Sequence, residues 1–301
     1  MSKLFFTVFT PVYNRKHTIH RVWESLIQQT NKNFEWIIVN DGSDDGVEPL
    51  LESYKEKADF DVRIFNQKNS GKHIAFNKAI EEARGELLID ADSDDGFDAT
   101  TVETFDRLWT EYKNDSLSGI IVLCKDEDNN IIGDKFPIEG ISSYKDIVYK
   151  YKIGGDKFGC MKVDILKKYR WPDKFGVKYF PESYVWSQIG VKYDCVCMNI
   201  PLYTVYFDAG NQLTNSEDLS MNVLKSRNFY TVWWINTILP EVSEYLTVLD
   251  TLKAFASLWK STLLIKGSPL STIKQIKKTK AKIWALLTFI PSFIMVKIFR
   301  F

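Results

Sequence analysis

The stretch that decides the fold of this chain is Gly85-Glu86-Leu87-Leu88-Ile89-Asp90-Ala91-Asp92-Ser93-Asp94-Asp95. Its apolar residues predict a buried strand at 87–91, which leads directly into four carboxylates within six residues. Carboxylates this close repel one another unless a cation neutralises them. Hard divalent ions such as Mn²⁺ or Mg²⁺ prefer oxygen ligands and often share them with substrate phosphates. The stretch therefore predicts a metal site beside a diphosphate, with a solvated acidic loop as the alternative.

A second acidic turn, Asn40-Asp41-Gly42-Ser43-Asp44-Asp45, follows another strand-like run at 34–39. In open α/β sheets, ligands bind beyond the carboxyl ends of the strands. Two acidic turns at equivalent strand ends of one parallel sheet converge on one crevice. The second turn therefore favours a metal site over a solvated loop.

Strand-like and helix-like segments alternate over the first 124 residues. This alternation predicts an α/β fold with a mainly parallel sheet and helices on both faces. The expected strands are 4–10 (ended by Pro11), 34–39, 62–65, 87–91 and 119–123, and the expected helices are 19–27, 73–83 and 100–112. From 125 the pattern is mixed, with a hairpin expected at 128–130, and from 218 it is mostly helical. We therefore expect one domain at 1–217, divided at 124 into two parts, and a helical C-terminal region at 218–301.

Composition limits the class of protein. The 301 residues include 39 basic and 39 acidic side chains, and 45% are hydrophobic, which fits a globular chain with a sizeable core and excludes intrinsic disorder. No apolar run reaches the roughly 18 residues that span a bilayer, and the first residues lead into a strand rather than a signal peptide. The cysteines lack the C-x-x-C spacing of a zinc site, so we expect free thiols in a reducing cytosol.

Four motifs occur in order along the first part of the chain. They are Thr10-Pro11-Val12-Tyr13-Asn14-Arg15, Val39-Asn40-Asp41-Gly42-Ser43-Asp44-Asp45, Asn69-Ser70-Gly71-Lys72 and Asp92-Ser93-Asp94-Asp95. In this order and spacing they resemble the motifs of family 2 glycosyltransferases over roughly residues 1–210. The resemblance implies a glycosyltransferase A fold, a nucleotide-sugar donor, a divalent cation and inversion at the anomeric carbon. It also makes 1–124 the nucleotide-sugar-binding part and 125–217 the acceptor side.

The resemblance also implies roles for individual residues. Pro11 and Tyr13 would flank the nucleobase, Asp41 would accept a hydrogen bond from a base N–H, and Asn69 and Gly71 would close over the nucleoside. Asp92 would lie near the ribose and the metal, and Asp94 would coordinate the cation that bridges the diphosphate. Lys72 and Ser93 complete the expected donor site. Tyr206, Asp208 and Asn211 lie where family members often add a late metal or phosphate contact.

The chain departs from the family pattern at three places. Asn40 stands where an aspartate is common. Phe76-Asn77 lies near the position of an arginine that contacts phosphate in many members, and Lys72 is either a partial substitute or a plain surface lysine. An inverting transfer needs a carboxylate base, yet the usual Glu-Asp pair is Glu182-Ser183 here. Glu182 is then the candidate base, with a helix-terminal acid as the alternative.

Other function classes compete with sugar transfer. A sugar-nucleotide-binding relative that has lost turnover stays open because of Ser183. A sugar-phosphate nucleotidyltransferase usually opens with a glycine-rich loop, whereas this chain has Pro11-Val12-Tyr13-Asn14 there. A dinucleotide oxidoreductase is disfavoured because no G-x-G-x-x-G follows the first strand.

The C-terminal region has a different charge balance from the rest. Residues 221–301 contain 12 basic and three acidic side chains, and 283–296 is an uncharged stretch between lysines. This pattern is typical of an interfacial helix on an anionic membrane surface; the alternative is a helix packed on the catalytic domain or in a dimer interface. Membrane attachment would place the protein on the inner face of the cell membrane and suit a lipid-linked acceptor in surface polysaccharide, capsule or lipopolysaccharide synthesis. A nucleic-acid partner is not expected, because aliphatic residues interrupt the basic ones.

Overall fold

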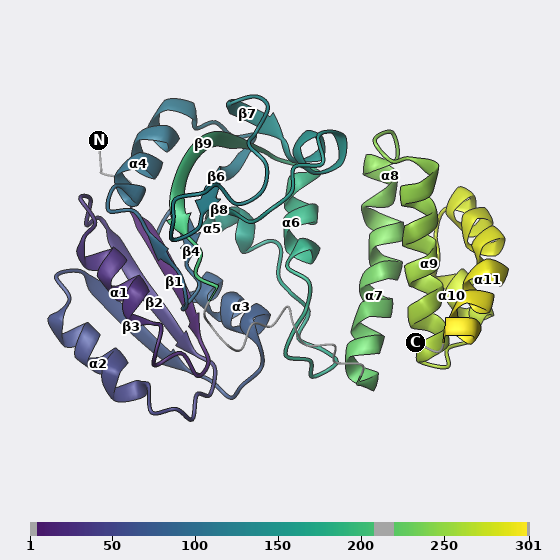
Figure 1. Ribbon diagram of the computed structural model, residues 1–301, viewed down its shortest axis with the longest axis horizontal. Coiled ribbons are helices and arrows are strands. Elements are labelled where there is room, and N and C mark those ends of the chain that lie inside the picture. The colour runs from purple at the N-terminus through teal and green to yellow at the C-terminus, as the bar shows by residue number, and fades with distance from the viewer. Residues whose placement is uncertain (1–4, 208–219, 300–301) are drawn as a thin grey trace.

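A computed structural model describes residues 5–207 and 220–299 of the chain, with side chains up to 294 (Figure 1). The strands are β1 (Phe6–Val12), β2 (Phe34–Asn40), β3 (Asp61–Asn66), β4 (Leu87–Asp90), β5 (Gly96–Phe97), β6 (Leu117–Lys125), β7 (Gly140–Ser143), β8 (Lys157–Lys162) and β9 (Asp194–Thr204). The helices up to β9 are α1 (His20–Ile27), α2 (Glu48–Lys57), α3 (Lys72–Glu82), α4 (Thr101–Tyr112), the π-helix η1 (Asp146–Lys150), α5 (Val163–Leu166) and α6 (Ser183–Gly190). Later come α7 (Met221–Thr237), α8 (Leu239–Val242), α9 (Val248–Leu264), α10 (Pro269–Gln275) and α11 (Thr279–Phe299).

The described strands form one sheet in the order β3-β2-β1-β4-β8-β6-β9-β5, and β7 pairs with β9. The half that carries the sequence motifs is parallel, because β1 pairs in parallel with both β2 and β4, and β2 with β3. The other half is mixed. β8 runs antiparallel between β4 and β6, so the predicted fifth strand does not lie beside the fourth. The α/β prediction is confirmed, and the mixed half explains why the pattern after 125 could not be read as simple alternation.

Two expected details differ from the structure. β1 continues through Pro11 to Val12 instead of ending before it. Its pairing with β4 ends where Phe9 lies opposite Asp90, so no ladder on that side needs the N–H that proline lacks. The helix α2 was not expected from the sequence, because among its described residues only Leu51 and Tyr54 are buried and its apolar periodicity is weak.

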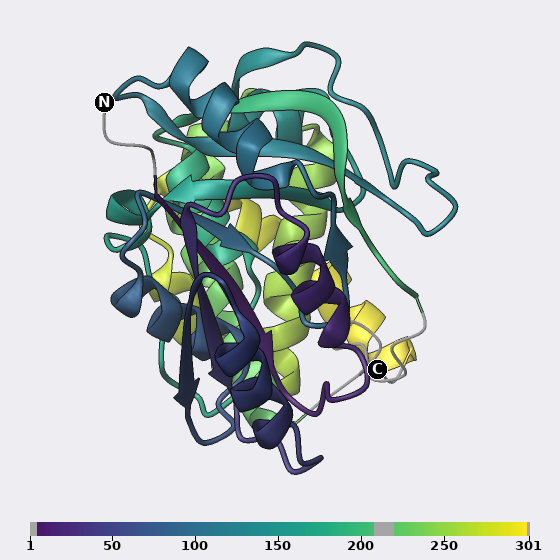
Figure 2. The same cartoon turned by 90° about the vertical axis from the view of Figure 1, so that its left-hand side faces the viewer.

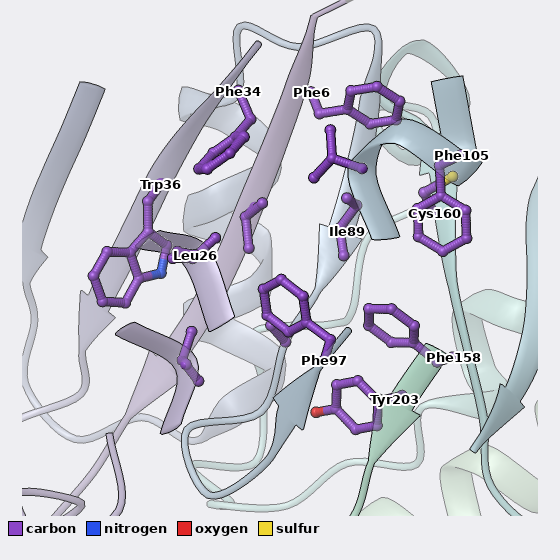
Figure 3. Close-up of a cluster of buried hydrophobic side chains, with 14 of the residues drawn as sticks. Phe6, Leu26, Phe34, Trp36, Ile89, Phe97, Phe105, Phe158, Cys160 and Tyr203 are labelled. Carbon is purple, nitrogen blue, oxygen red and sulfur yellow. The ribbon is translucent and has the colours of Figure 1, made fainter. Parts of the chain in front are cut away.

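Helices cover both faces of the sheet. One face packs against α1, α2 and α4 around a buried cluster that includes Phe6, Trp36 and Phe105 (Figure 3). The other face packs against α3, α5 and α6, with Phe76, Leu166 and Val185 in its core. The four cysteines, Cys124, Cys160, Cys195 and Cys197, are free, as predicted, and all four are buried. Because both faces are covered, the central strands β1 and β2 are almost continuously buried.

The C-terminal helices form a bundle of their own beside the sheet (Figures 1 and 2). Its core contains Ile235, Phe255, Trp259 and Ala285, and α7 connects it to the catalytic part by packing against α6. The boundary predicted between 217 and 218 lies outside the described residues. Among the described residues, no helix combines the length and the hydropathy that crossing a bilayer requires.

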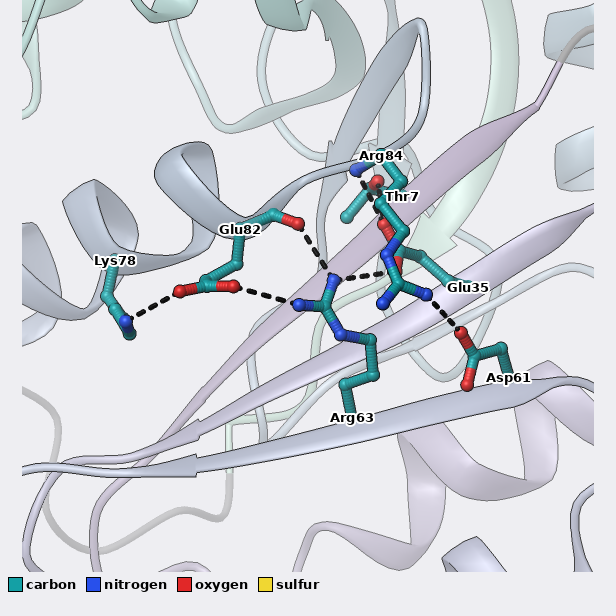
Figure 4. Close-up of polar contacts among 7 residues, drawn as sticks. All are labelled: Thr7, Glu35, Asp61, Arg63, Lys78, Glu82 and Arg84. Carbon is teal, nitrogen blue, oxygen red and sulfur yellow. Dashed lines mark hydrogen bonds and ion pairs between the residues drawn. The ribbon is translucent and has the colours of Figure 1, made fainter.

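A charged network around the buried Glu35 lies at the amino ends of the parallel strands, opposite the motif loops (Figure 4). Glu35, at the start of β2, is fully buried and accepts hydrogen bonds from Thr7 Oγ1 at 2.8 Å and from the Arg84 backbone N–H at 2.7 Å. Arg63 on β3 pairs with Glu35 at 3.1 Å and with Glu82, at the end of α3, at 2.8 Å. These contacts join the amino ends of three strands, far along each strand from the motif loops, so we assign them a structural role.

Candidate active site

The loops after β1, β2 and β4 converge at the carboxyl end of the parallel strands. The backbone N–H of Asn14 donates to Ser43 Oγ at 3.0 Å, and the Asp44 N–H donates to Asn14 Oδ1 at 2.9 Å. Next to them, Arg15 Nε lies 3.5 Å from Asp94 Oδ2. The loop after β1 therefore links the two acidic turns, and their predicted convergence is confirmed.

Asp41 organises the segment that follows β3. Its Oδ1 atom accepts hydrogen bonds from Gln67 Nε2 at 2.8 Å and from the Ser70 N–H at 2.7 Å, and its Oδ2 atom accepts from the Gly71 N–H at 2.7 Å. The residue is buried. Asp41 thus has a positioning role that the motif did not reveal, and its contact with a nucleobase stays a prediction.

A second loop covers the Asn69–Gly71 segment. The Nζ atom of Lys178 donates a hydrogen bond to the Asn69 carbonyl oxygen. Gly71 has a φ of +94°, and a Cβ at this position would clash with the carbonyl group of Lys178. Only glycine fits here, which gives a physical reason for the third motif.

Lys72 connects the expected metal motif, Asp92-Ser93-Asp94-Asp95, to the candidate base Glu182. Its Nζ atom lies 2.7 Å from Asp92 Oδ1, 3.0 Å from Glu182 Oε1 and 3.5 Å from Asp90 Oδ2. Burial lowers the pKa of this ammonium group, but the negative charges of the three carboxylates outweigh burial and raise its pKa well above the ordinary value. Lys72 is therefore a charged residue inside the site and not a plain surface lysine.

The metal motif is supported by the end of β9. The backbone N–H of Asp92 donates to the Tyr203 hydroxyl at 2.9 Å, and the Tyr206 N–H donates to Asp95 Oδ1 at 3.0 Å. Tyr206 also stacks under the Arg21 guanidinium, which lies 4.0 Å from the ring centroid. Tyr206 therefore lies at the motif, as the resemblance suggested, whereas Asp208 and Asn211 lie outside the described residues.

Burial disfavours the charged form of three carboxylates at the motif. Burial, together with the charge of Asp92, raises the pKa of Asp95 to about 8. Burial likewise raises the pKa of Asp90 to about 7, against the opposing effect of Lys72, and the Oδ1 atom of Asp90 is buried without a hydrogen-bond partner among the described residues. The pKa of Asp94 is raised too, by burial first and by Asp92 second. A bound cation would relieve this excess of charge.

The residues fit a cation that is shared with a diphosphate. Among the described residues, no group of three or more His, Cys, Asp or Glu side chains is arranged to hold a metal alone. A magnesium-like ion needs only one or two carboxylates when substrate phosphates supply further oxygens. Asp94 and Asp92 supply carboxylate oxygens of this kind, and their side chains are 20% and 41% exposed, so a ligand can reach them.

Two basic residues near Asp94 were not selected from the sequence. Arg15 pairs with its carboxylate, and Arg21 Nη1 donates to its backbone carbonyl oxygen at 2.8 Å. Arg15 belongs to the first motif, so its place directly after β1 was a usable signal. Arg21 gave no signal, because it is one charged position on the helix α1.

The side chains of Glu182 and Ser183 contact different parts of the protein. Glu182 stands just before α6 and faces Lys72, with its side chain 45% exposed. Ser183 Oγ instead lies 2.8 Å from the hydroxyl of Tyr230 on α7. Of the two, only Glu182 is beside the metal motif, which favours it over a mere helix-terminal acid.

The remaining expected residues also have clear positions. Tyr13 is 45% exposed, and a nucleobase can reach it, while Ser93 is buried within the metal motif. Phe76 and Asn77 contact residues of the protein interior. Phe76 packs on Phe9 in the core, and Asn77 Nδ2 donates to the Trp171 carbonyl oxygen at 2.9 Å. The position of the family arginine is therefore structural here.

Comparison with known proteins gives one family and one fold. A family model for glycosyl transferase family 2 matches residues 7–170. Glycosyltransferase GlyA of Streptococcus pneumoniae is 34% identical over 113 residues, which are 38% of this chain and 16% of GlyA. The putative teichuronic acid biosynthesis glycosyltransferase TuaG of Bacillus subtilis is 39% identical over 90 residues, which are 30% of this chain and 35% of TuaG. The chain thus matches well under two-thirds of either relative.

Solved structures show the same fold at low identity. S. aureus TarS 1-349 in complex with UDP-GlcNAc has a TM-score of 0.67 and 15% identity, covering 96% of this chain and 89% of TarS 1-349. The mannosyltransferase PcManGT from Pyrobaculum calidifontis, in complex with GDP-Man and Mn²⁺, has a TM-score of 0.58 and 14% identity, covering 97% and 88%. The expected glycosyltransferase A fold is confirmed. Because the family model covers more than half of the 301 residues, the chain belongs to glycosyl transferase family 2.

Proposed function

We propose that this protein transfers a sugar from a nucleotide-sugar donor, with a UDP-sugar as the expected form, to a hydroxyl of a glycan or lipid-linked acceptor. The observation that carries the proposal is the position of Glu182. Its carboxylate lies 3.0 Å from Lys72 Nζ, and the same ammonium group lies 2.7 Å from the carboxylate of Asp92. An acid far along the chain from the donor motif thus reaches that motif. UDP-GlcNAc and GDP-Man are bound by the proteins of similar fold named above.

The reaction follows from this arrangement. Glu182 takes the proton of the acceptor hydroxyl while the oxygen of that hydroxyl attacks the anomeric carbon. The bond from that carbon to the β-phosphate oxygen breaks on the opposite face, so the configuration inverts and the nucleoside diphosphate leaves with the electron pair. Asp94 and Asp92 would hold Mn²⁺ or Mg²⁺, which when bound supplies charge neutralisation for the leaving diphosphate. Lys72 holds Glu182 beside the motif and adds positive charge there.

The acceptor and the place of action belong to the same proposal. TuaG carries a name from teichuronic acid biosynthesis, and we infer a related role in bacterial surface polysaccharide, such as capsule or lipopolysaccharide. The basic, apolar C-terminal region supports attachment to the inner face of the cell membrane, where a lipid-linked acceptor lies.

A donor panel tests the proposal. The purified protein is incubated with Mn²⁺ and with UDP- and GDP-sugars, and nucleoside diphosphate release is measured, since transferases often hydrolyse their donor slowly. We expect release with one donor class, loss of release in chelator, and a decrease of about 100-fold or more in Asp94→Asn, because the cation ligand is lost. Asp128→Asn, in the exposed turn after β6, is the matched control.

The same assay examines the base. Glu182→Gln keeps the shape of the side chain and removes its ability to take a proton, so transfer should fall by about 10² to 10⁴. Near-normal transfer by Glu182→Gln would contradict the base assignment. Undiminished turnover by folded Asp94→Asn in chelator would contradict the whole mechanism, and pyrophosphate release from a nucleoside triphosphate would support a nucleotidyltransferase instead.

A further inference from the structure

The helix α11 has one buried face of small side chains and one exposed face of large aliphatic side chains. On one face, Ala281, Ala285, Thr288 and Ser292 are buried at i, i+4, i+7 and i+11. This face packs on α9, where the indole N–H of Trp259 donates to the Ala285 carbonyl oxygen at 2.9 Å. The small side chains let the two helices approach closely. This face therefore packs within the C-terminal bundle and not on the catalytic domain, which was one of the sequence alternatives to a membrane helix.

The opposite face is exposed to solvent. Its members are large aliphatic side chains with exposed fractions of 48 to 65%: Ile283, Leu286, Leu287, Ile290 and Ile294. With 100° per residue, these positions lie on the side of the helix away from the α9 contact. We call them the outer face of α11. Five large aliphatic side chains exposed together on one helix face are typical of an interaction surface.

Charge identifies the partner. Residues 251–301 contain ten Lys or Arg and no Asp or Glu. Five of the lysines, at 274, 277, 278, 280 and 282, lie on α10, at the start of α11 or between them, and all but Lys282 are exposed. A surface that combines exposed aliphatic side chains with clustered lysines matches an anionic bilayer, in which acyl chains lie under negative headgroups. A second copy of the chain offers no such match, because its own outer face carries the same positive surroundings.

We propose that the outer face of α11 inserts into the surface of an anionic lipid bilayer while the inner face stays on α9. The helix lies in the plane of the interface, because α9 occupies its other side and prevents lipid from surrounding it. This inference deepens the membrane attachment proposed above by naming the lipid class and the residues that contact it. It does not depend on the transfer reaction.

Vesicle sedimentation of the full chain tests the inference. The probes are vesicles of phosphatidylglycerol mixed with phosphatidylcholine, and vesicles of phosphatidylcholine alone. We expect binding to the anionic vesicles, about tenfold or more weaker binding to the neutral ones, and weakening by added salt. The double variant Leu287→Gln/Ile290→Gln should bind anionic vesicles about tenfold or more weakly than the wild type. Both positions are 65% exposed, so the fold should be unaffected, as circular dichroism will check.

The matched control removes exposed aliphatic side chains elsewhere. Ile138→Gln/Ile141→Gln, at positions 58% and 48% exposed in the catalytic part, should bind vesicles like the wild type. Equal binding by the α11 variant and the wild type, or no binding by either, would overturn the inference. So would a dimer that the α11 variant converts to monomer without lipid. Nucleoside diphosphate release without vesicles is measured on the same samples, so that a failure of membrane binding and a failure of the proposed reaction are told apart.

Discussion

Three carboxylates around the ammonium group of Lys72 form the centre of the candidate site. The sequence left open whether Lys72 is a partial substitute for a missing arginine or a plain surface lysine. The structure brings it to Asp92, Asp90 and Glu182, at 2.7, 3.5 and 3.0 Å. With a cation bound as proposed, the positive charge of Lys72 would compete for Asp92, while its ion pair with Glu182 holds the candidate base in place.

Removing this charge should separate the two effects. We expect Lys72→Met to bind Mn²⁺ more tightly in the presence of UDP, because one competing positive charge is gone, while kcat falls by about 10- to 100-fold through loss of positioning. Calorimetric titration and donor turnover measure the two quantities. Lys68→Met, upstream in the same loop and exposed, is the control. Weaker Mn²⁺ binding by Lys72→Met would contradict this role.

His73 links stability to pH. Burial lowers its pKa to about 4, against the opposing charges of Asp41 and Asp173. In the unfolded chain the pKa is about 6.5, so below that pH the unfolded state binds a proton that the folded state does not. The folded state should therefore lose up to about 3 kcal/mol from this residue as the pH falls from about 6.5 to about 4.

The measurement is a difference curve. The free energy of unfolding of His73→Gln minus that of the wild type should increase as the pH falls through this range, because only the wild type loses stability through His73. The carboxylates contribute equally to both proteins and cancel in the difference. His20→Gln, on the exposed face of α1, is the control substitution. A flat curve for His73→Gln would show that the imidazole is not held neutral by the fold.

At the scale of elements, loop residues make most of the contacts in the site, together with Lys72 at the start of α3 and Asp90 at the end of β4. The parallel strands β1, β2 and β4 only bring their following loops together, and the loop residues make the contacts: Asn14 to Ser43, Asp41 to Gly71, Lys178 to Asn69. The loop that contains Lys178 comes from the mixed part of the chain. Its closure over the Asn69–Gly71 segment is therefore a tertiary contact between distant parts of the sequence.

Gly71 allows this closure, and alanine there should disturb it. A residue with a Cβ at φ +94° and ψ 156° would be strained by about 1 to 3 kcal/mol, and the clash with the Lys178 backbone adds to this cost. We expect Gly71→Ala to lower the free energy of unfolding by more than about 2 kcal/mol and to raise KM for the donor several-fold. Gly176→Ala is a close control, because Gly176 also has a positive φ, of +58°, but the space that a Cβ would occupy there is open. Equal effects of the two substitutions would show that the contact with Lys178 is unimportant.

At the scale of the whole molecule, the helical bundle and the catalytic part meet beside Glu182. The helix α6 begins directly after Glu182, and its Tyr184 ring lies 4.3 Å from the Trp233 ring of α7. Ser183 contacts Tyr230 on the same helix. The bundle that carries the lipid-binding surface proposed above is therefore packed against the element that holds the candidate base.

Trp233→Ala should weaken this junction. Loss of the half-buried ring should cost about 2 kcal/mol of stability and reduce kcat several-fold, because α6 loses its support. Phe289→Ala removes an aromatic side chain from the contact with Trp259 in the bundle core, and should lower Tm without changing kcat. Thermal unfolding and donor turnover measure both variants. Unchanged kcat in Trp233→Ala would mean that the bundle does not support the site.

Local sequence was sufficient to predict the parallel half of the sheet, the convergence of its acidic loops and the family. These features depend on apolar runs, turn residues and motif spacing, all of which can be read from short stretches of sequence. The prediction of two acidic turns at one edge needed only the rule that parallel strands end together.

The remaining features required the folded chain. The insertion of β8 between β4 and β6, the closure of Lys178 over Asn69, and the three carboxylates around Lys72 all join residues far apart in the chain. No local pattern encodes such contacts, because they depend on which surfaces remain to be buried once the elements have formed. The helix α11 shows this plainly: packing on α9 buries its side of small residues and leaves its large aliphatic side chains exposed, the reverse of what hydrophobicity alone predicts.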